Sequence, residues 1–331
     1  MNFELGLIAS ATLIVITVAA FAALISKLTF PSALMWLKRL APSTRSNLLW
    51  IWAMLPLLLG LAALFIVLLP SMFHFMGIAT DHCLEHVHHA HLCLVHSPAF
   101  VGNPLELLVL GSLALVTFRK LSRIGASIIR DCRTTSMLNS MSIQPSNPED
   151  HHVLTSNRVF AFTIGLFRPL VFVSSRLTEV LDHKELLIVL SHEDGHRLRR
   201  DGLRKLSARI LASAHFQTTR QTLLAELELA TEQSCDEHAA GSLDDRLSVA
   251  ETILKLSRLA SMDHIRGDSV SAFNASDCER RIEGLLNPPI PRNRYLSAIW
   301  MVILCVLSVS GLMSADFWHH ITESLFGIHL G

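Results

Sequence analysis

The chain has 331 residues, of which 50% are hydrophobic and 17% are charged. Soluble domains carry about a quarter charged residues, so this composition, with a mean hydropathy of +0.42, argues against a purely soluble protein. The formal net charge is zero, which provides no overall field for nucleic acid, and we expect no direct nucleic-acid binding. Six cysteines in a chain of this length argue against a disulfide scaffold.

Four apolar segments predict transmembrane helices, because each approaches the roughly 20 residues that cross a bilayer. They lie at about residues 5–25, 48–69, 99–118 and 296–315. Asn103, Pro104 and Glu106 interrupt the third segment. The first segment has no basic residue before it and no small-residue cleavage site, so we interpret it as a spanning helix and not as a signal peptide.

The basic residues predict the orientation of these spans. Every Lys and Arg lies within residues 27–45 or 119–294, and none lies in the loop 71–103 or after Arg294. Because Lys- and Arg-rich flanks stay in the cytoplasm, we expect both termini and the 71–103 loop outside a bacterial inner membrane. The predicted organisation is a three-span membrane region over 1–118, a cytoplasmic domain over 119–295, and a fourth span with a short external tail over 296–331.

The predicted external loop contains a histidine-rich stretch, DHCLEHVHHAHLCLVH, at residues 81–96. Five of its possible metal donors recur at helical spacing and would form one stripe on a helix: His82, His86, His89, Cys93 and His96. Cys83 is a sixth candidate metal ligand. Imidazole and thiolate donors suit zinc or copper, so a second transition-metal site is one interpretation.

Two alternatives for this stretch remain open. A Cys83–Cys93 disulfide is reasonable in an oxidising exterior. It excludes the helix, because ten helical residues separate the cysteines by about 15 Å, whereas a disulfide tolerates about 7 Å between Cα atoms. The third interpretation is a polar loop that happens to be rich in histidine.

The predicted cytoplasmic domain is α+β and mostly helical. It begins with a basic helix, FRKLSRIGASIIRDCR, and a loop rich in Pro, Ser and Asn. Two β-rich runs, VFAFTI and LVFVSS, are separated by Gly165 and Pro169 and predict a hairpin. The later pattern predicts helices at about 177–198, 206–229, 230–240 and 247–259, with a short last helix at CERRIEGLL.

The first of these helices contains His-Glu-x-x-His. His192 and His196 are four residues apart, which places them on one helix face, where two imidazoles can bind one Zn²⁺ at about 2.0–2.1 Å. Glu193 is rotated by about 100°, so it can act as a general base on water. A chance match in a histidine-rich chain is the alternative, and Asp194 and Gly195 are unfavourable inside a helix.

Catalytic zinc needs a third protein ligand. The segment ELATEQSCDEHAAG places Glu232 and Asp236 one helical turn apart. Glu232 can complete a His/His/Glu set, and Asp236 can accept a hydrogen bond from a ligand histidine. Glu226, Glu228 and Glu237 are alternative third ligands.

The chain resembles the BlaR/MecR-type antirepressor membrane metallopeptidases in three segments: VLSHEDGHRLRRDGLRKL, ELATEQSCDEHAAG and the hairpin. The same arrangement of motifs is found in the related CaaX-prenyl and heat-shock membrane zinc proteases. The resemblance covers about residues 157–286 and implies a gluzincin-like zinc peptidase fold. It implies that His192, His196 and Glu232 bind one catalytic zinc and that Glu193 is the general base. It also places Asp201 and Asp236 beside these ligands.

The same resemblance implies that the edge strand of the hairpin, about residues 159–164, holds the substrate as an added strand. A basic residue near the end of the domain is expected to stabilise the oxyanion; Arg281 is the first candidate, with Arg280 and His238 as alternatives. Those relatives carry a penicillin-binding sensor domain after the last span, whereas about 16 residues follow Ala315 here. We therefore do not expect direct β-lactam sensing.

The leading functional hypothesis is a membrane-embedded zinc endopeptidase that cleaves a cytoplasmic or membrane protein. In this hypothesis it is a signal transducer that cleaves a winged-helix transcriptional repressor in response to external metal. One alternative is a non-catalytic metal-sensing receptor, which would not need Glu193. The other is a metal-handling membrane protein, which would place ionisable ligands within its spans.

The predicted topology can be tested directly. Reporter fusions after Phe73 and after Gly331 should be active outside the membrane, and fusions near Asn147 should be active in the cytoplasm. A cytoplasmic Gly331 would mean that one span is misassigned, and the interrupted third segment would be examined first.

Overall fold

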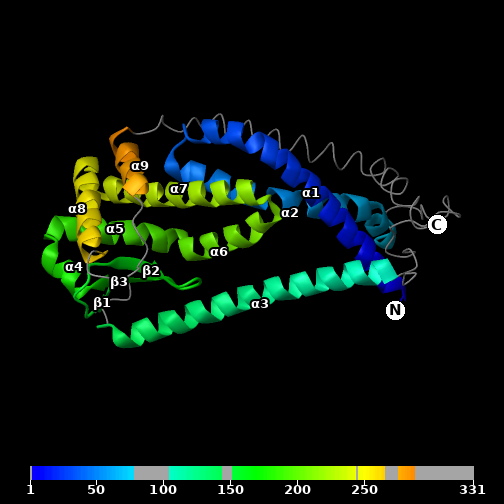
Figure 1. The fold of residues 1–331 in the computed structure, drawn as a ribbon, viewed down its shortest axis with the longest axis horizontal. Coiled ribbons are helices and arrows are strands. Elements are labelled where there is room, and N and C mark those ends of the chain that lie inside the picture. The colour runs from blue at the N-terminus through cyan, green and yellow to red at the C-terminus, as the bar shows by residue number, and fades with distance from the viewer. Residues whose placement is uncertain (1, 78–103, 144–150, 244, 265–274, 288–331) are drawn as a thin grey trace.

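The computed structural model describes residues 2–77, 104–143, 151–243, 245–264 and 275–287. Figure 1 shows two long N-terminal helices, a long separate helix, and a small sheet with a group of helices packed against it. The site described below lies in the sheet-and-helix part of the molecule, and three features of the fold position it.

The first feature is a hairpin of two long helices, α1 (Asn2–Leu37) and α2 (Pro42–Phe75). The two backbones approach closely at Gly60, where a Cβ would lie 2.7 Å from the carbonyl oxygen of Val15. Only glycine allows this approach, because it has no Cβ. The two helices therefore pack as a pair along their apolar sequences.

Two helices in the described part of the chain are long and apolar enough to cross a membrane, over Leu7–Leu37 and Pro42–Leu69, which suggests membrane association. The first predicted span, 5–25, overlaps the first of them from Leu7 onward, and the second, 48–69, lies within the other. The third falls at the start of α3 (Pro104–Met141), which is not among these candidates. Its apolar run between Glu106 and Arg119 has only 12 residues (107 to 118), against the roughly 20 that a span needs.

Four spans are thus not confirmed. The predicted fourth span, at 296–315, lies outside the described residues. The histidine-rich stretch does too, and so do all of its candidate ligands: His82, Cys83, His86, His89, Cys93 and His96.

The end of the hairpin that contains the α1–α2 connection is part of the domain core. One buried cluster combines residues of α1, α2 and the helices that carry the site: Phe30, Leu34, Leu37, Leu49, Ala53, Ala208, Ala212, Leu223, Leu227 and Ala230. At its edge, the indole nitrogen of Trp50 donates to Ser207 at 3.0 Å. The hairpin and the domain are therefore joined by a continuous apolar core and not by a linker.

The second feature is a three-stranded sheet of β1 (His152–Leu154), β2 (Ala161–Ile164) and β3 (Leu170–Ser174), in the order β1-β3-β2. β2 and β3 pair antiparallel, which confirms the predicted hairpin. β1 pairs parallel with β3 and was not predicted, because three residues carry too little pattern. Among the strands in the described part of the chain, β2 pairs with β3 alone, so its other side is a free edge there.

The third feature is a layer of helices. They are α4 (Ser175–Val180), α5 (His183–Arg199), α6 (Asp201–Leu211), a 3₁₀ turn (Ala212–Ala214), α7 (Gln217–Leu243), α8 (Arg246–His264) and α9 (Ala275–Leu286). α5 packs against β2 and β3 on one side and against α7 on the other, and α9 packs against α7 and α8. The site forms where α5 and α7 face each other.

The predicted helix boundaries were wrong in two places. The helix expected at 177–198 is divided, because Asp182 caps α5 in a capping box with Glu185. The break expected between 229 and 230 does not occur, since α7 runs through it; the chain turns earlier, around His215, where the 3₁₀ turn ends.

Candidate metal centre

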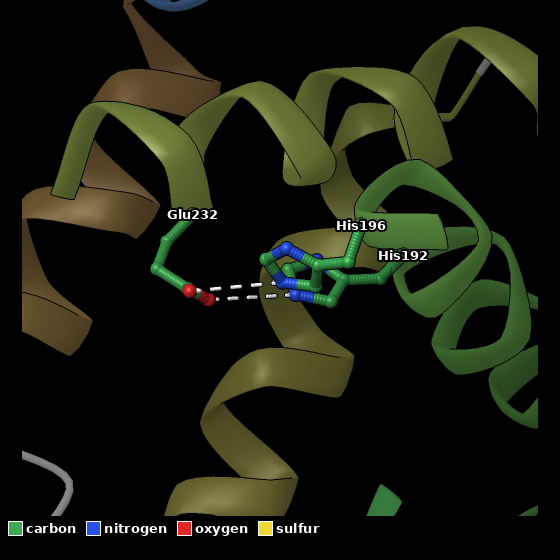
Figure 2. A group of neighbouring side chains, drawn as sticks. All are labelled: His192, His196 and Glu232. Atoms are coloured by element: carbon green, nitrogen blue, oxygen red, sulfur yellow. Dashed lines mark ion pairs between the residues drawn. The ribbon is translucent and has the colours of Figure 1, made fainter. Parts of the chain in front are cut away.

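Two histidines of α5 and one glutamate of α7 converge on a single point (Figure 2). The Nε2 atom of His192 lies 3.5 Å from one carboxylate oxygen of Glu232, and the Nε2 atom of His196 lies 3.6 Å from the other. One ligand atom from each residue lies within 4.8 Å of the other two. This group can therefore hold one metal ion.

The opposite nitrogen of each imidazole is held by another carboxylate. Nδ1 of His192 lies 2.9 Å from Asp236, and Nδ1 of His196 lies 2.8 Å from Asp201 at the start of α6. An imidazole that donates its Nδ1 proton in this way presents the lone pair of Nε2 to a metal. The two histidines and Glu232 thus fit the donor set of a catalytic zinc site, with three protein ligands and an open position.

Arg281 supports this arrangement from α9. Its Nε and Nη2 donate to the two oxygens of Asp236 at 2.8 and 2.7 Å, and its Nη1 lies 3.6 Å from Glu232. Burial alone would raise the pKa of Asp236, but the charge and hydrogen bonds of Arg281, with a smaller contribution from His192, lower it. Asp236 therefore remains a carboxylate and can accept the proton of His192.

Burial and charged neighbours also act in opposite directions on the pKa values of Glu232 and His196. Burial tends to raise the pKa of Glu232, but hydrogen bonds from His192 and His196 hold it well below its usual range. Burial tends to lower the pKa of His196, but its contacts with Asp201, Cys235 and Glu232 raise it to about 12. Three carboxylates, those of Asp201, Glu232 and Asp236, lie against the two imidazoles, a charge arrangement that can accommodate a divalent cation.

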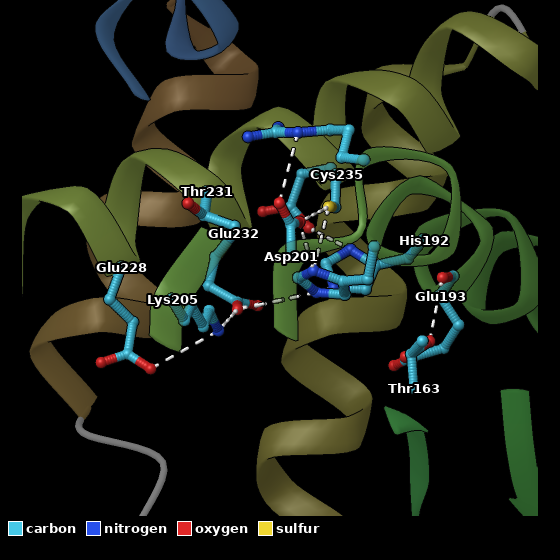
Figure 3. A network of polar contacts seen from close by, with 12 residues as sticks. Thr163, His192, Glu193, Asp201, Lys205, Glu228, Thr231, Glu232 and Cys235 are labelled. Atoms are coloured by element: carbon cyan, nitrogen blue, oxygen red, sulfur yellow. Dashed lines mark hydrogen bonds and ion pairs between the residues drawn. The ribbon is translucent and has the colours of Figure 1, made fainter. Parts of the chain in front are cut away.

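Glu193 is held by the edge strand. The hydroxyl of Thr163, on β2, donates to the Glu193 carboxylate at 2.8 Å and also contacts its backbone carbonyl oxygen at 3.0 Å. Figure 3 shows this pair next to the histidines. Only 8% of Glu193 is exposed, so its carboxylate is positioned by the fold and not by solvent.

These residues line one cavity of about 780 Å³. One wall carries the metal ligands, Glu193 and Arg281, and another is the β2 strand. The apolar part of the lining includes Val249, Ile253 and Leu256 of α8. The cavity therefore combines a polar centre with an apolar compartment, next to the edge of β2 that no described strand covers.

Of the four glutamates considered as the third metal ligand, Glu232 is the one that lies beside the two histidines. Glu226 pairs with Arg280 at 2.8 Å, Glu228 with Lys205 at 3.5 Å, and Glu237 with Arg246 at 2.7 Å. None of these three glutamates lines the cavity in the described part of the chain. Among the basic candidates for oxyanion stabilisation, Arg281 lines the cavity, whereas Arg280 and His238 do not.

Among the polar residues of the cavity wall that sequence reasoning missed, two contact Glu193 or Glu232. One is Thr163, whose partner Glu193 is distant in the sequence. The other is Lys205 of α6, whose ammonium lies 3.3 Å from Glu232 (Figure 3). Lys205 is four residues after Asp201, so helical spacing could have placed the two on one face.

The unfavourable glycine inside the His-Glu-x-x-His motif has a packing explanation. Gly195 is buried against α7, where a Cβ would lie 3.2 Å from Sγ of Cys235 and 3.4 Å from its Cα. Cys235 in turn lies 3.4 Å from Nδ1 of His196. Glycine therefore allows α5 and α7 to approach closely enough for ligands on both helices to meet.

Comparison with known proteins gives one match. The family model described as Peptidase family M48 matches residues 130–272, a segment that includes His192, Glu193, His196 and Glu232. No curated protein and no solved structure matches the chain. The match supports a metallopeptidase, of a family that is typically zinc-dependent, but not the BlaR/MecR-type subfamily specifically.

The contact between Gly195 and Cys235 can be tested by substitution. Gly195→Ala should lower the free energy of unfolding by about 1–3 kcal/mol, because the added methyl overpacks the α5–α7 contact, and it should weaken zinc binding. Combining it with Cys235→Ala should recover much of both losses, since the nearest atom, Sγ, is removed. Thermal unfolding and zinc titration measure the two effects.

Gly241→Ala is the matched control, because it lies on α7 and a Cβ there meets nothing within 4 Å. This substitution should not destabilise the protein. Strictly additive effects of Gly195→Ala and Cys235→Ala would contradict the packing explanation.

Proposed function

We propose that the protein is a zinc metalloendopeptidase of the gluzincin type, embedded in a bacterial inner membrane with its active site toward the cytoplasm. The observation that carries the proposal is the convergence of His192, His196 and Glu232, with Glu193 on the wall of the same cavity. The M48 match supports the peptidase activity, and the two long apolar helices support the membrane association.

In this proposal His192, His196 and Glu232 hold the zinc ion, and Asp236 and Asp201 fix the imidazoles. Bound zinc supplies a Lewis acid that polarises the scissile carbonyl and makes water more acidic. Glu193 accepts a proton from the attacking water and later delivers it to the leaving amine. Thr163 orients the Glu193 carboxylate through its 2.8 Å hydrogen bond. Arg281 is the candidate for stabilising the oxyanion.

The shape of the site favours an extended polypeptide as substrate. The free edge of β2 runs along the cavity, so a peptide can add to the sheet as a further strand. The Val249, Ile253 and Leu256 side chains then offer an apolar compartment for a side chain near the scissile bond. The substrate we expect is a protein segment with an apolar residue at that position.

The signalling role extends this proposal and rests on the sequence resemblance and the histidine-rich loop. In it the substrate is a winged-helix transcriptional repressor, and a transition metal bound to the external loop is the signal. The contact of Glu193 with Thr163 at the cavity wall favours an enzyme over a non-catalytic receptor, because a site that only binds metal has no need of an oriented base.

Two substitutions separate metal binding from catalysis. Glu193→Gln should retain about one zinc per chain and lower the rate of cleavage of labelled casein at least about 100-fold, because only the base is altered. His196→Ala should lose the zinc and the activity together. Metal analysis and a fluorescence assay on the detergent-solubilised full chain give the two readouts, and a chelator should inhibit the parent protein reversibly.

Glu228→Gln is the matched control, one turn before Glu232 on α7, with a side chain that is 62% exposed. It should keep both zinc and activity. Equal cleavage by the parent protein and Glu193→Gln would exclude the proposed mechanism.

A further inference from the structure

A buried chain of hydrogen bonds connects the helical hairpin to α9. Arg45, in the first turn of α2, donates Nη2 to the side-chain oxygen of Gln233 on α7. The amide nitrogen of Gln233 then donates to the backbone carbonyl of Arg280 on α9 at 2.6 Å. Arg45 and Gln233 are 7% and 8% exposed, so solvent does not compete effectively for these contacts.

Two members of this series of hydrogen bonds are sequence neighbours of residues at the candidate metal centre. Gln233 directly follows the ligand Glu232 on α7, and Arg280 directly precedes Arg281 on α9. Arg281 holds Asp236 through two hydrogen bonds and lies 3.6 Å from Glu232. The contact between Gln233 and α9 is therefore one of the contacts that hold the segment carrying Arg281 beside the ligand helix α7.

A buried acid, Glu226, strengthens the same junction. Glu226 of α7 accepts from Nη2 of Arg280 at 2.8 and 3.0 Å, and the ammonium of Lys38, which follows α1, lies 3.3 Å from it. Glu226 is 7% exposed. The polar junction thus joins both arms of the hairpin, the ligand helix α7 and the arginine-bearing helix α9.

The fit at this junction leaves no spare room. A Cβ at Gly284 of α9 would lie 2.8 Å from the amide nitrogen of Gln233. A methyl group there must displace the Gln233 amide, because the two cannot occupy the same space. Gly284 therefore allows α9 to rest directly on the Gln233 side chain.

We propose that Arg45 and Gln233 are positioning residues of the peptidase site. The hairpin holds α9 through Arg45, Gln233 and the carbonyl of Arg280, and α9 holds Arg281 against Asp236 and Glu232. This inference rests on the proposed peptidase function. It assigns to the hairpin a second role beside membrane association, which is to keep the catalytic arginine in place.

Three substitutions interrupt this series of hydrogen bonds at different points. Arg45→Met removes the donor on α2. Gln233→Glu keeps an acceptor for Arg45 but removes the donor to the Arg280 carbonyl. Gly284→Ala changes no polar group and favours the helix, since alanine has the higher helix propensity, but it displaces the Gln233 amide. All are made in the full chain, purified in detergent with zinc.

For all three variants we expect kcat on labelled casein to fall about 10-fold, because a displaced Arg281 no longer supports the reacting geometry. KM should change less than about 2-fold, because the β2 edge and the apolar compartment are untouched. A second readout does not depend on proteolysis: release of zinc to a chromogenic chelator should be about 10-fold faster, since Asp236 and Glu232 lose their partner.

Asn47→Ala is the matched control. Asn47 accepts a hydrogen bond from Arg204 of α6 at 2.7 Å, so this variant also breaks a contact between the hairpin and the domain, but one that does not lead to α9. It should retain the parent kcat and rate of zinc release. Arg45→Lys keeps a donor and should retain more activity than Arg45→Met.

Parent-like kcat and zinc release in Gln233→Glu and Gly284→Ala would overturn the inference, whether or not Arg45→Met folds. An effect of Arg45→Met alone would overturn it too, because the hairpin would then act by a route that avoids α9. If the parent protein itself cleaves nothing, the proposed function fails, while the rates of zinc release still decide whether the chain of contacts positions Arg281.

Discussion

Two aspartates contact the Nδ1 atoms of the two histidines, and the geometry of the site depends on this pair of contacts. Asp236 and Asp201 lie 2.9 and 2.8 Å from the Nδ1 atoms of His192 and His196, so both Nε2 atoms turn toward Glu232. Without these carboxylates the imidazole rings would be free to rotate about χ2, which is a soft torsion. The charge of the aspartates must itself be kept, and for Asp236 this is the task of Arg281. Each of the two histidines is thus held by a carboxylate, and at His192 that carboxylate is itself held by Arg281.

The backbone contributes by bringing these groups from four helices to one place. α5 carries two of the candidate ligands, α7 carries the third, the first residue of α6 is Asp201, and α9 provides Arg281. The distance between α5 and α7 is limited by Gly195 against Cys235, and that between α7 and α9 by Gly284 against Gln233. Glycine is costly in both helices by propensity, yet at each position the approach of a neighbouring helix requires it.

Local patterns in the sequence singled out His192, His196, Glu232 and Asp236, which the structure brings together, but not the contacts that surround them. The spacing of His192 and His196, and of Glu232 and Asp236, is a property of single helices and is visible without a structure. The hairpin of β2 and β3 follows from its β-rich runs and the glycine between them. β1, the contact of Thr163 with Glu193 and the link from Arg45 to Gln233 join distant segments, and no local pattern records them. The division between α4 and α5 was missed because the helical periodicity continues across the Asp182 cap.

The apolar core shared by the hairpin and the domain limits which segments of the gene can be exchanged separately. Its members come from α1, α2, α6, the 3₁₀ turn and α7, so neither part completes its own interior. The segment that matches the family model, residues 130–272, leaves out the hairpin and also α9 with Arg281. A gene fragment cut at those borders would expose Leu223 and Leu227 to water and would lack the arginine that holds Asp236. Recombination that exchanged residues 130–272 alone would therefore separate each part from residues that complete it, so the helical hairpin and the candidate metal centre form one heritable unit.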